Sequence, residues 1–291
     1  MSLVVAWIRR LPSRDELIVA SDSRLGFGAR WDCCPKIFPL AREDSILAFC
    51  GQTLFAYPIL LQLAKSIENY GKSESRELDI VDLRAHFLKL IERMRLEIRD
   101  FPKGDHGLDT TDFRILFAGY SSKLKKFKAW SLYYDKTASR FNHRPLSFHY
   151  KRSNGTKPFL FMGDNEDIAT ATLFERLKAA GKLKSGPLDM EPLDVLVEMI
   201  QVPGYDTIGG PPQIVKVYPH ARVLPINVLW PITQPEYVAH FGRPLLGYEG
   251  SKYACLDLET KALMAPYEAY GRIKKPDQGS APSDPAAAGH E

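Results

Sequence analysis

The sequence predicts an α+β fold in which two β-sheets pack together and helices lie outside them. Of its 291 residues, 45% are hydrophobic and 25% are charged, which is an ordinary composition for a globular protein. A chain of this length can bury a substantial core. The patterns along it run in the order strands, two helices, strands, two helices, strands, whereas a parallel βαβ fold would alternate the two kinds of element.

The first fifty residues alternate between short apolar runs and turn residues. The runs are rich in Val, Ile, Leu and Phe, and the turn between the first two is Pro12-Ser13-Arg14-Asp15. Runs of this length and composition, bounded by turns, are typical of strands. The predicted strands are Leu3–Ile8, Leu17–Ala20, Lys36–Pro39 and Ile46–Cys50.

Helical spacing replaces this pattern in the next segment. Apolar residues recur at three and four from Thr53 to Tyr70, with Pro58 in the first turn, and again roughly from Ile80 to Arg99. Two later helices are predicted at Asp167–Ala180 and Leu193–Val202. The remaining predicted strands are Asp112–Tyr120, Phe127–Asp135, Phe141–Tyr150, Pro158–Met162, Gln213–Tyr218 and Val223–Trp230. The basic run Lys123–Lys128 is interpreted as a solvated hairpin loop.

Charge and composition argue against several classes of function. The net charge of +4 is spread along the chain without a basic, aromatic-rich stripe, so no nucleic-acid partner is expected. No apolar stretch approaches the ~20 residues of a membrane helix, and the charges at the start follow the apolar run, the reverse of a signal peptide. We therefore expect a cytoplasmic protein without a membrane partner.

Metal and cofactor sites are not expected either. The four cysteines include the adjacent pair Cys33-Cys34, which lacks zinc-ligand spacing, and we expect all four to be reduced thiols. The histidines show no metal spacing, and neither a phosphate loop nor a dinucleotide fingerprint occurs. A nucleophilic role for Cys33 or Cys34 with a distant histidine is a weaker alternative to packing.

Five segments resemble, in the same order, the signature elements of proteasome β-subunits. Ile18–Arg24 resembles the VLAADSR signature, and Cys34–Ile37 the element that carries the catalytic lysine. The other three matches are Ile46–Thr53 for the strand before the oxyanion turn, Phe113–Tyr120 with Lys128–Tyr134 for the central hairpin, and Tyr205–Gly210 for the element before the closing strand. The resemblance spans about residues 2–220 and is closest to the bacterial HslV and Anbu-like members. It implies the four-layer αββα sandwich of N-terminal-nucleophile hydrolases.

The resemblance also implies a nucleophile and the groups around it. Removal of Met1 would leave Ser2 as the N-terminal residue, whose hydroxyl attacks with its own α-amine as the base, although threonine is usual in the family. Lys36 would help this amine stay neutral, and Asp22 would hold Lys36 in place. Judged without the resemblance, Ser2 merely opens a strand, Lys36 is a surface residue and Asp22 caps a turn.

Further roles follow from the same matches. The backbone N–H of Gly51 would bind the oxyanion, and Thr53 would line the pocket for the substrate residue before the cut. Asp206 would orient the amine, with Asp164 and Ser23 in support; taken alone, Gly51 and Asp206 are ordinary turn residues. The chain departs from the family at Asp164, where a serine is usual, and at Gln52, where the oxyanion turn has a second glycine.

The resulting hypothesis is a peptidase that cuts peptides or unfolded proteins through an acyl-enzyme, inside a self-compartmentalising homo-oligomer. A separate ATPase or other unfoldase is a possible partner. The alternatives are a catalytically silent proteasome-like scaffold or partner subunit, and an amide acylase that needs no ring. The predicted domains are the hydrolase domain at 1–220, a C-terminal extension at 221–271 and a disordered tail at 272–291.

Overall fold

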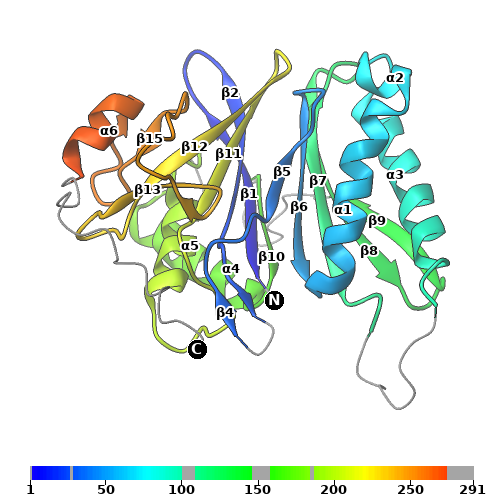
Figure 1. Cartoon of the computed structure of the whole chain (residues 1–291), viewed down its shortest axis with the longest axis horizontal. Coiled ribbons are helices and arrows are strands. Elements are labelled where there is room, and N and C mark those ends of the chain that lie inside the picture. Colours follow the sequence, from blue (N-terminus) through cyan, green and yellow to red (C-terminus); the bar gives the residue numbers. More distant parts are fainter. Residues whose placement is uncertain (1, 27–28, 100–108, 146–157, 184–186, 274–291) are drawn as a thin grey trace, which may run out of the picture.

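A computed structural model describes residues 2–26, 29–99, 109–145, 158–183 and 187–273. Within these ranges the chain forms an α+β fold whose sheets are antiparallel except for one strand pair (Figure 1). The predictions for Met1, for the strand end at 146–150 and for the tail beyond Ile273 lie outside the described residues.

The larger sheet is built around the first strand. Its strands follow the order β10-β1-β2-β11-β12-β13-β14, with β15 joined in parallel to β12, and β16 paired with β15. The bounds are β1 Leu3–Arg10, β2 Asp15–Ser21, β10 Phe159–Gly163, β11 Gln213–Tyr218, β12 Arg222–Trp230, β13 Tyr237–His240, β14 Arg243–Pro244, β15 Cys255–Leu256 and β16 Leu263–Met264.

The second sheet is an antiparallel meander of five strands in sequence order. These strands are β5 Ile37–Pro39, β6 Ser45–Gly51, β7 Phe113–Ser121, β8 Lys126–Asp135 and β9 Arg140–Pro145. The predicted hairpin is confirmed, since β7 and β8 pair with each other, but its loop is shorter than the basic run, because Lys126–Lys128 belong to β8. A separate small hairpin joins β3 Leu25–Gly26 to β4 Arg30–Trp31.

Helices lie on the outer side of each sheet. In Figure 1, α1 and α3 cover the five-stranded sheet, while α4 and α5 lie against the larger one. The predicted apolar stripe of α3 is confirmed, since Leu83, Phe87 and Ile91 are fully buried. The helices are α1 Thr53–Glu68, α2 Gly71–Glu74, α3 Ile80–Arg95, α4 Glu166–Ala179, α5 Glu191–Gln201 and α6 Pro266–Arg272.

The strand β1 is buried on both of its faces. Leu3, Val5 and Trp7 belong to the apolar cluster shared with α4 and α5. Val4 and Ala6, on the opposite face, belong to a cluster with strands of the second sheet. Alternate side chains of a strand point to opposite faces, so β1 contributes one face to each of these two clusters.

The segment predicted as an extension begins inside the larger sheet. Strand β12 pairs with β11 along its first half, and its second half carries β13 and β15. The turn after β13 reaches the core, because a Cβ atom added to Gly242 would lie 2.2 Å from the Ser23 hydroxyl oxygen. Among the described residues, no helix is long and apolar enough to cross a membrane.

Candidate functional site

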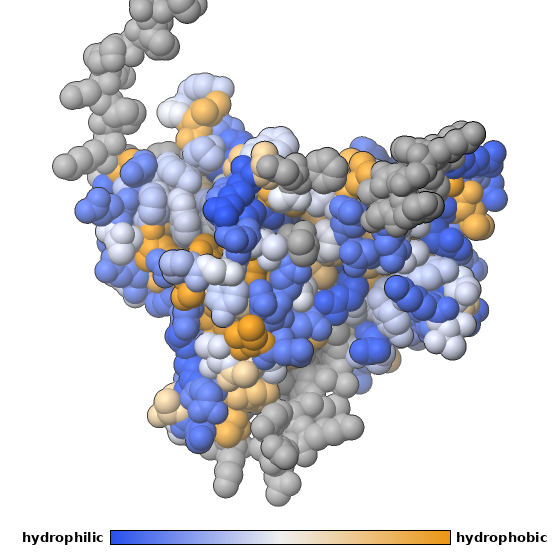
Figure 2. Space-filling model, turned by 90° about the horizontal axis from the view of Figure 1, so that it is seen from below, coloured by the Kyte–Doolittle hydropathy of each residue, from blue (hydrophilic) through white to orange (hydrophobic). Residues whose placement is uncertain are grey.

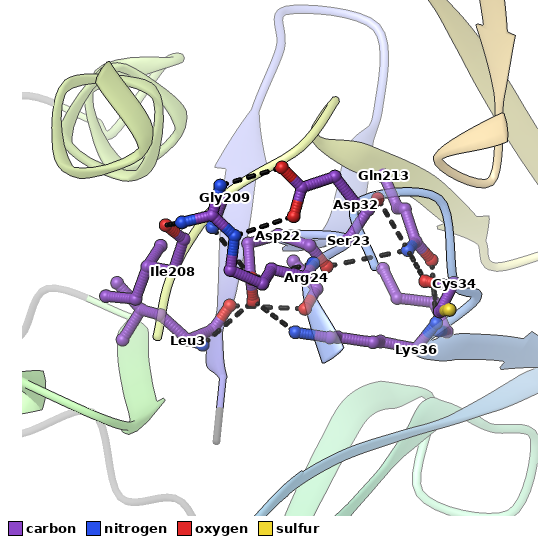
Figure 3. Close-up of polar contacts among 12 residues, drawn as sticks. Leu3, Asp22, Ser23, Arg24, Asp32, Cys34, Lys36, Ile208, Gly209 and Gln213 are labelled. Carbon is purple, nitrogen blue, oxygen red and sulfur yellow. Dashed lines mark hydrogen bonds and ion pairs between the residues drawn. The ribbon is translucent and has the colours of Figure 1, made fainter. Parts of the chain in front are cut away.

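The predicted site residues Asp22 and Lys36 meet in the interior. The Oδ1 atom of Asp22 accepts hydrogen bonds from the Lys36 ammonium at 2.8 Å and from the Leu3 backbone N–H at 3.0 Å (Figure 3). Its Oδ2 atom accepts the backbone N–H groups of Arg24 and Gly209, each at 3.1 Å. One carboxylate thus joins the residue after Ser2 to a lysine from the other sheet.

Strand register explains why Asp22 meets the N-terminal strand. The β1–β2 ladder pairs Val4 with Ser21, so Asp22, the residue just after β2, lies opposite Leu3. The backbone N–H of Asp22 donates to the Leu3 carbonyl at 3.3 Å, which continues the ladder by one step. The carboxylate is therefore fixed beside the start of the chain by main-chain geometry.

Lys36 is fully buried and reaches Asp22 from the residue before β5. Burial lowers the pKa of Lys36, because removal from water disfavours the charged ammonium. The Asp22 carboxylate opposes that shift most strongly, and Asp164 adds a smaller opposing effect. The Lys36 amine therefore lies out of contact with bulk water, on the same Asp22 oxygen that accepts the Leu3 N–H.

Gln213, at the start of β11, is a site residue that the sequence analysis missed. Its side-chain oxygen accepts the Lys36 backbone N–H at 2.9 Å, and its amide nitrogen donates to the Ser23 hydroxyl at 2.9 Å and to the Cys34 carbonyl at 2.7 Å. The side chain thereby bridges the two sheets at the point where Lys36 begins its reach. The sign of it in the sequence was a glutamine at the start of a strand run that is apolar apart from Lys216.

Ser2 is fully buried in the full-length chain, and its backbone pairs with the residue after β10. The Asp164 backbone N–H donates to the Ser2 carbonyl at 2.8 Å, which extends the Leu3–Gly163 register by one residue. The predicted neighbour Asp164 therefore does lie beside Ser2. Its Oδ2 atom is buried and has no hydrogen-bond partner.

An ion pair that the sequence analysis did not predict stabilises the turn at Gly163 and Asp164. Arg114 of β7 contacts Glu166 at 2.6 Å, and the same Glu166 oxygen accepts the Gly163 backbone N–H at 2.9 Å. Both side chains are about one-third exposed. Arg114 and Glu166 therefore fix the peptide that precedes Asp164.

Gly51 ends β6 in a conformation that favours glycine. Its φ is 99°, and a Cβ atom there would lie 2.5 Å from the Asp112 carbonyl oxygen. The preceding residue, Cys50, packs in the layer between the sheets, and its Cβ would lie 3.2 Å from one built on Gly163. The end of β6 is thus close to the Ser2 turn.

Thr53 lines a hollow of about 310 Å³ close to Gly51 in sequence, and its role in a substrate pocket stays a prediction. The hollow lies between the β3–β4 hairpin and the first turn of α1, at the lower side of Figure 1. Its lining is mostly apolar and comprises Leu25, Gly26, Ala29, Trp31, Gln52, Thr53 and Leu54. Figure 2 shows the molecule from that side, where hydrophobic residues form small groups among hydrophilic ones. Trp31 and Leu54 are more than half exposed there.

The remaining predicted site residues are Ser23 and Asp206. Ser23 is buried. Its hydroxyl donates to the Pro211 carbonyl at 2.5 Å and accepts a hydrogen bond from the Gln213 side chain, so it links the segment after β2 to the start of β11. The structure does not bring Asp206 to the cluster. Its carboxylate is 77% exposed and forms an ion pair with Arg30 at 2.6 Å, so its proposed role at the amine stays a prediction.

Arg24 closes the site on that side. It makes a two-pronged ion pair with Asp32 at 2.6 and 2.7 Å, and this hydrogen bonding lowers the pKa of the Asp32 carboxyl. A second arm donates to the Ile208 carbonyl at 3.3 Å. Arg24 thereby anchors the loop whose Gly209 N–H binds Asp22.

Burial makes two of the cysteines poor candidates for a nucleophile. All four cysteines are unpaired, and burial raises the pKa of Cys34 and of Cys50 to about 11. A thiol with such a pKa is protonated and a poor nucleophile at neutral pH. Within the described ranges, no three His, Cys, Asp or Glu side chains are arranged to hold a metal ion.

No protein-family model matches the sequence, and no curated protein is similar enough to it to count as a relative. The geometry above is therefore the basis for a functional assignment.

Proposed function

We propose that the chain is a proteasome-type peptidase whose nucleophile is the hydroxyl of Ser2 after removal of Met1. One observation supports this most directly: the fully buried Asp22 carboxylate holds both the Lys36 ammonium and the Leu3 N–H on a single oxygen. An interior lysine is rare without a purpose that offsets its desolvation. Here it lies next to the chain start, where an N-terminal nucleophile would need it.

The finer architecture belongs to the same proposal. Helices α4 and α5, the two sheets, and helices α1 and α3 follow one another through three apolar clusters. This succession supports the four-layer αββα sandwich of N-terminal-nucleophile hydrolases. A cytoplasmic homo-oligomer that takes peptides or unfolded proteins, served by a separate unfoldase, completes the proposal.

The proposed reaction proceeds through an ester. The Ser2 α-amine takes the hydroxyl proton as Oγ bonds to the substrate carbonyl carbon, and the Gly51 N–H stabilises the oxyanion. The carbon–nitrogen bond then breaks, and the same proton passes to the leaving amine. Water attacks the ester, restores the hydroxyl and releases the second product. Lys36, charged and held by Asp22, favours the neutral form of the attacking amine through electrostatic repulsion.

The decisive experiment is the intact mass of the purified protein after reaction with a β-lactone or epoxyketone. We expect loss of Met1 and one adduct that maps to Ser2. Ser2→Ala also permits Met1 removal but lacks the hydroxyl, so it should show no adduct and at least a 1000-fold loss of peptide hydrolysis, since removal of a nucleophile disables the whole catalytic unit. Ser13→Ala, in the exposed β1–β2 turn, is the matched control and should react normally.

A catalytically silent, proteasome-like scaffold or partner subunit is the second candidate. It is favoured by the complete burial of Ser2 in the full-length chain. A mass that retains Met1 and shows no adduct would support the scaffold and contradict the peptidase. An adduct on a monomer or dimer would instead point to an amide acylase.

The hollow beside Gly51 predicts a preference for apolar residues before the cleaved bond. Its lining is apolar and its volume suits one large side chain. Fluorogenic peptides with Leu or Phe at that position should have kcat/KM about 10-fold or more above those with Ala, because each buried methylene adds about 1 kcal/mol or more.

The variant Thr53→Arg would fill the hollow with a charged side chain and should remove most of this preference. Leu61→Arg, at an exposed position two turns along the same helix, is the matched control. Equal kcat/KM values for Leu, Ala and Asp peptides in the unmodified protein would contradict the assignment of this hollow.

A further inference from the structure

Asp164 is the charged group near Ser2 that the proposed mechanism does not use. Its backbone N–H binds the Ser2 carbonyl at 2.8 Å, so the two residues are neighbours across the β1–β10 ladder. Its Oδ2 atom is buried and has no hydrogen-bond partner. A buried, unpaired carboxylate oxygen is costly and calls for a donor at this place.

The position of the carboxylate can be cross-checked against its effects on neighbours. Its negative charge raises the pKa of Lys36, and it also raises the pKa of Cys50. Lys36 is the residue before β5, and Cys50 lies on β6 of the second sheet. Both effects agree with the backbone contact that places Asp164 beside Ser2.

We propose that the Asp164 carboxylate binds the α-ammonium group of Ser2 once Met1 has been removed, and so makes hydrolysis depend on alkaline pH. This inference rests on the proposed function only for its catalytic consequence. Removal of Met1 creates a cation with three N–H donors at the residue paired with Asp164. That cation provides the missing donor for Oδ2, and Asp164 acts as a positioning residue for the amine.

The other charged groups around the amine leave Asp164 as its available anion. On β2, Asp22 is already used by Lys36 and three backbone donors. Glu166, at the start of α4, is paired with Arg114 of β7. Lys36 repels the ammonium and acts against Asp164, while burial keeps the Cys50 thiol neutral at working pH.

Binding by Asp164 affects the pKa of the Ser2 α-amine, which is the base of the proposed reaction. The ordinary pKa of an α-amine is about 7.7–8.0, and a carboxylate in contact raises such a value by about 1–3 units. The ammonium must release its proton to solvent before the amine can accept one from the Ser2 hydroxyl. The rate should therefore rise with pH above 8, and loss of the Asp164 charge should move the rise to lower pH.

The pKa of the amine can be measured without catalysis. Trace labelling of the processed protein with acetic anhydride, read by mass spectrometry of the N-terminal peptide across pH 6–11, reports the neutral fraction of the α-amine. We expect Asp164→Asn to lower the midpoint by about one unit or more. Asp167→Asn removes an exposed charge from the first turn of α4 and should leave the midpoint unchanged.

The rate of β-lactone labelling at Ser2 against pH provides the second readout. A midpoint that moves in Asp164→Asn without any adduct supports the inference and contradicts the peptidase. An adduct with an unmoved midpoint does the reverse. Asp164→Ser, which supplies a neutral hydroxyl, serves if the asparagine variant does not fold, and retention of Met1 overturns the inference outright.

Discussion

Substitution of Asp22 by Ala is expected to lower the free energy of unfolding by about 3–5 kcal/mol. The carboxylate is the main counter-charge of the fully buried Lys36 and also accepts three backbone N–H groups. Its removal leaves an ammonium in the interior without its principal partner, together with orphaned donors on Leu3 and Gly209. Urea denaturation followed by circular dichroism measures the loss.

Substitution of Lys36, the partner of Asp22, tests whether the loss of stability comes from the unpaired charge. Lys36→Met keeps a long apolar side chain and leaves Asp22 with its three backbone donors, so it should cost clearly less than Asp22→Ala. Asp206→Ala breaks an exposed ion pair and should change the stability by no more than about 1 kcal/mol. Equal losses in Asp22→Ala and Asp206→Ala would show that the interior pair does not stabilise the fold.

The β-strands and helices that position this site could be predicted from hydrophobic periodicity. The stripe of Leu83, Phe87 and Ile91 repeats at four residues and is buried along its length. The apolar runs at the start of the chain became β1 and β2 with ends that moved by no more than two residues. Local pattern suffices here because each element buries a face of its own.

The contact between Asp22 and Lys36 could be anticipated only by resemblance. Asp22 follows β2 and Lys36 precedes β5, which belong to different sheets, and no local pattern records which buried groups will meet. Gln213 makes the same point, since it bonds to Lys36 from 177 residues away. A polar residue at the head of an apolar strand is a weak sign of a buried network, and its partners depend on the packing of the sheets.

The segment after β12 escaped prediction for a different reason. Strands β14, β15 and β16 are two residues long, which is too short for a period of two to appear. Their pairing depends on β12 and β13, already in place at the edge of the larger sheet. His240, stacked on Tyr253 and bonded to Asn227 at 2.7 Å, holds this segment through contacts that no motif encodes.

The glycine that precedes Asp164 links the stability of the fold to the position of the nucleophile. Gly163 has a φ of 127°, and a Cβ atom there would lie 1.9 Å from the Ser2 carbonyl oxygen. The clash is with backbone rather than a flexible side chain, so the start of β1 would have to move. The same movement would break the Asp164–Ser2 hydrogen bond and displace Ser2.

Gly163→Ala should therefore reduce stability by about 3–6 kcal/mol, from backbone strain and overpacking together. In any fraction that folds, β-lactone labelling of Ser2 should fall at least 100-fold, because a displacement of about 1 Å is enough to disrupt a catalytic arrangement. Gly204→Ala is the matched control, with a φ of 109° and open space around it. It carries the strain without the clash and should cost about 1–3 kcal/mol with labelling unchanged. A Gly163→Ala protein that folds and labels like Gly204→Ala would contradict both the packing of the Ser2 turn and its part in the proposed reaction.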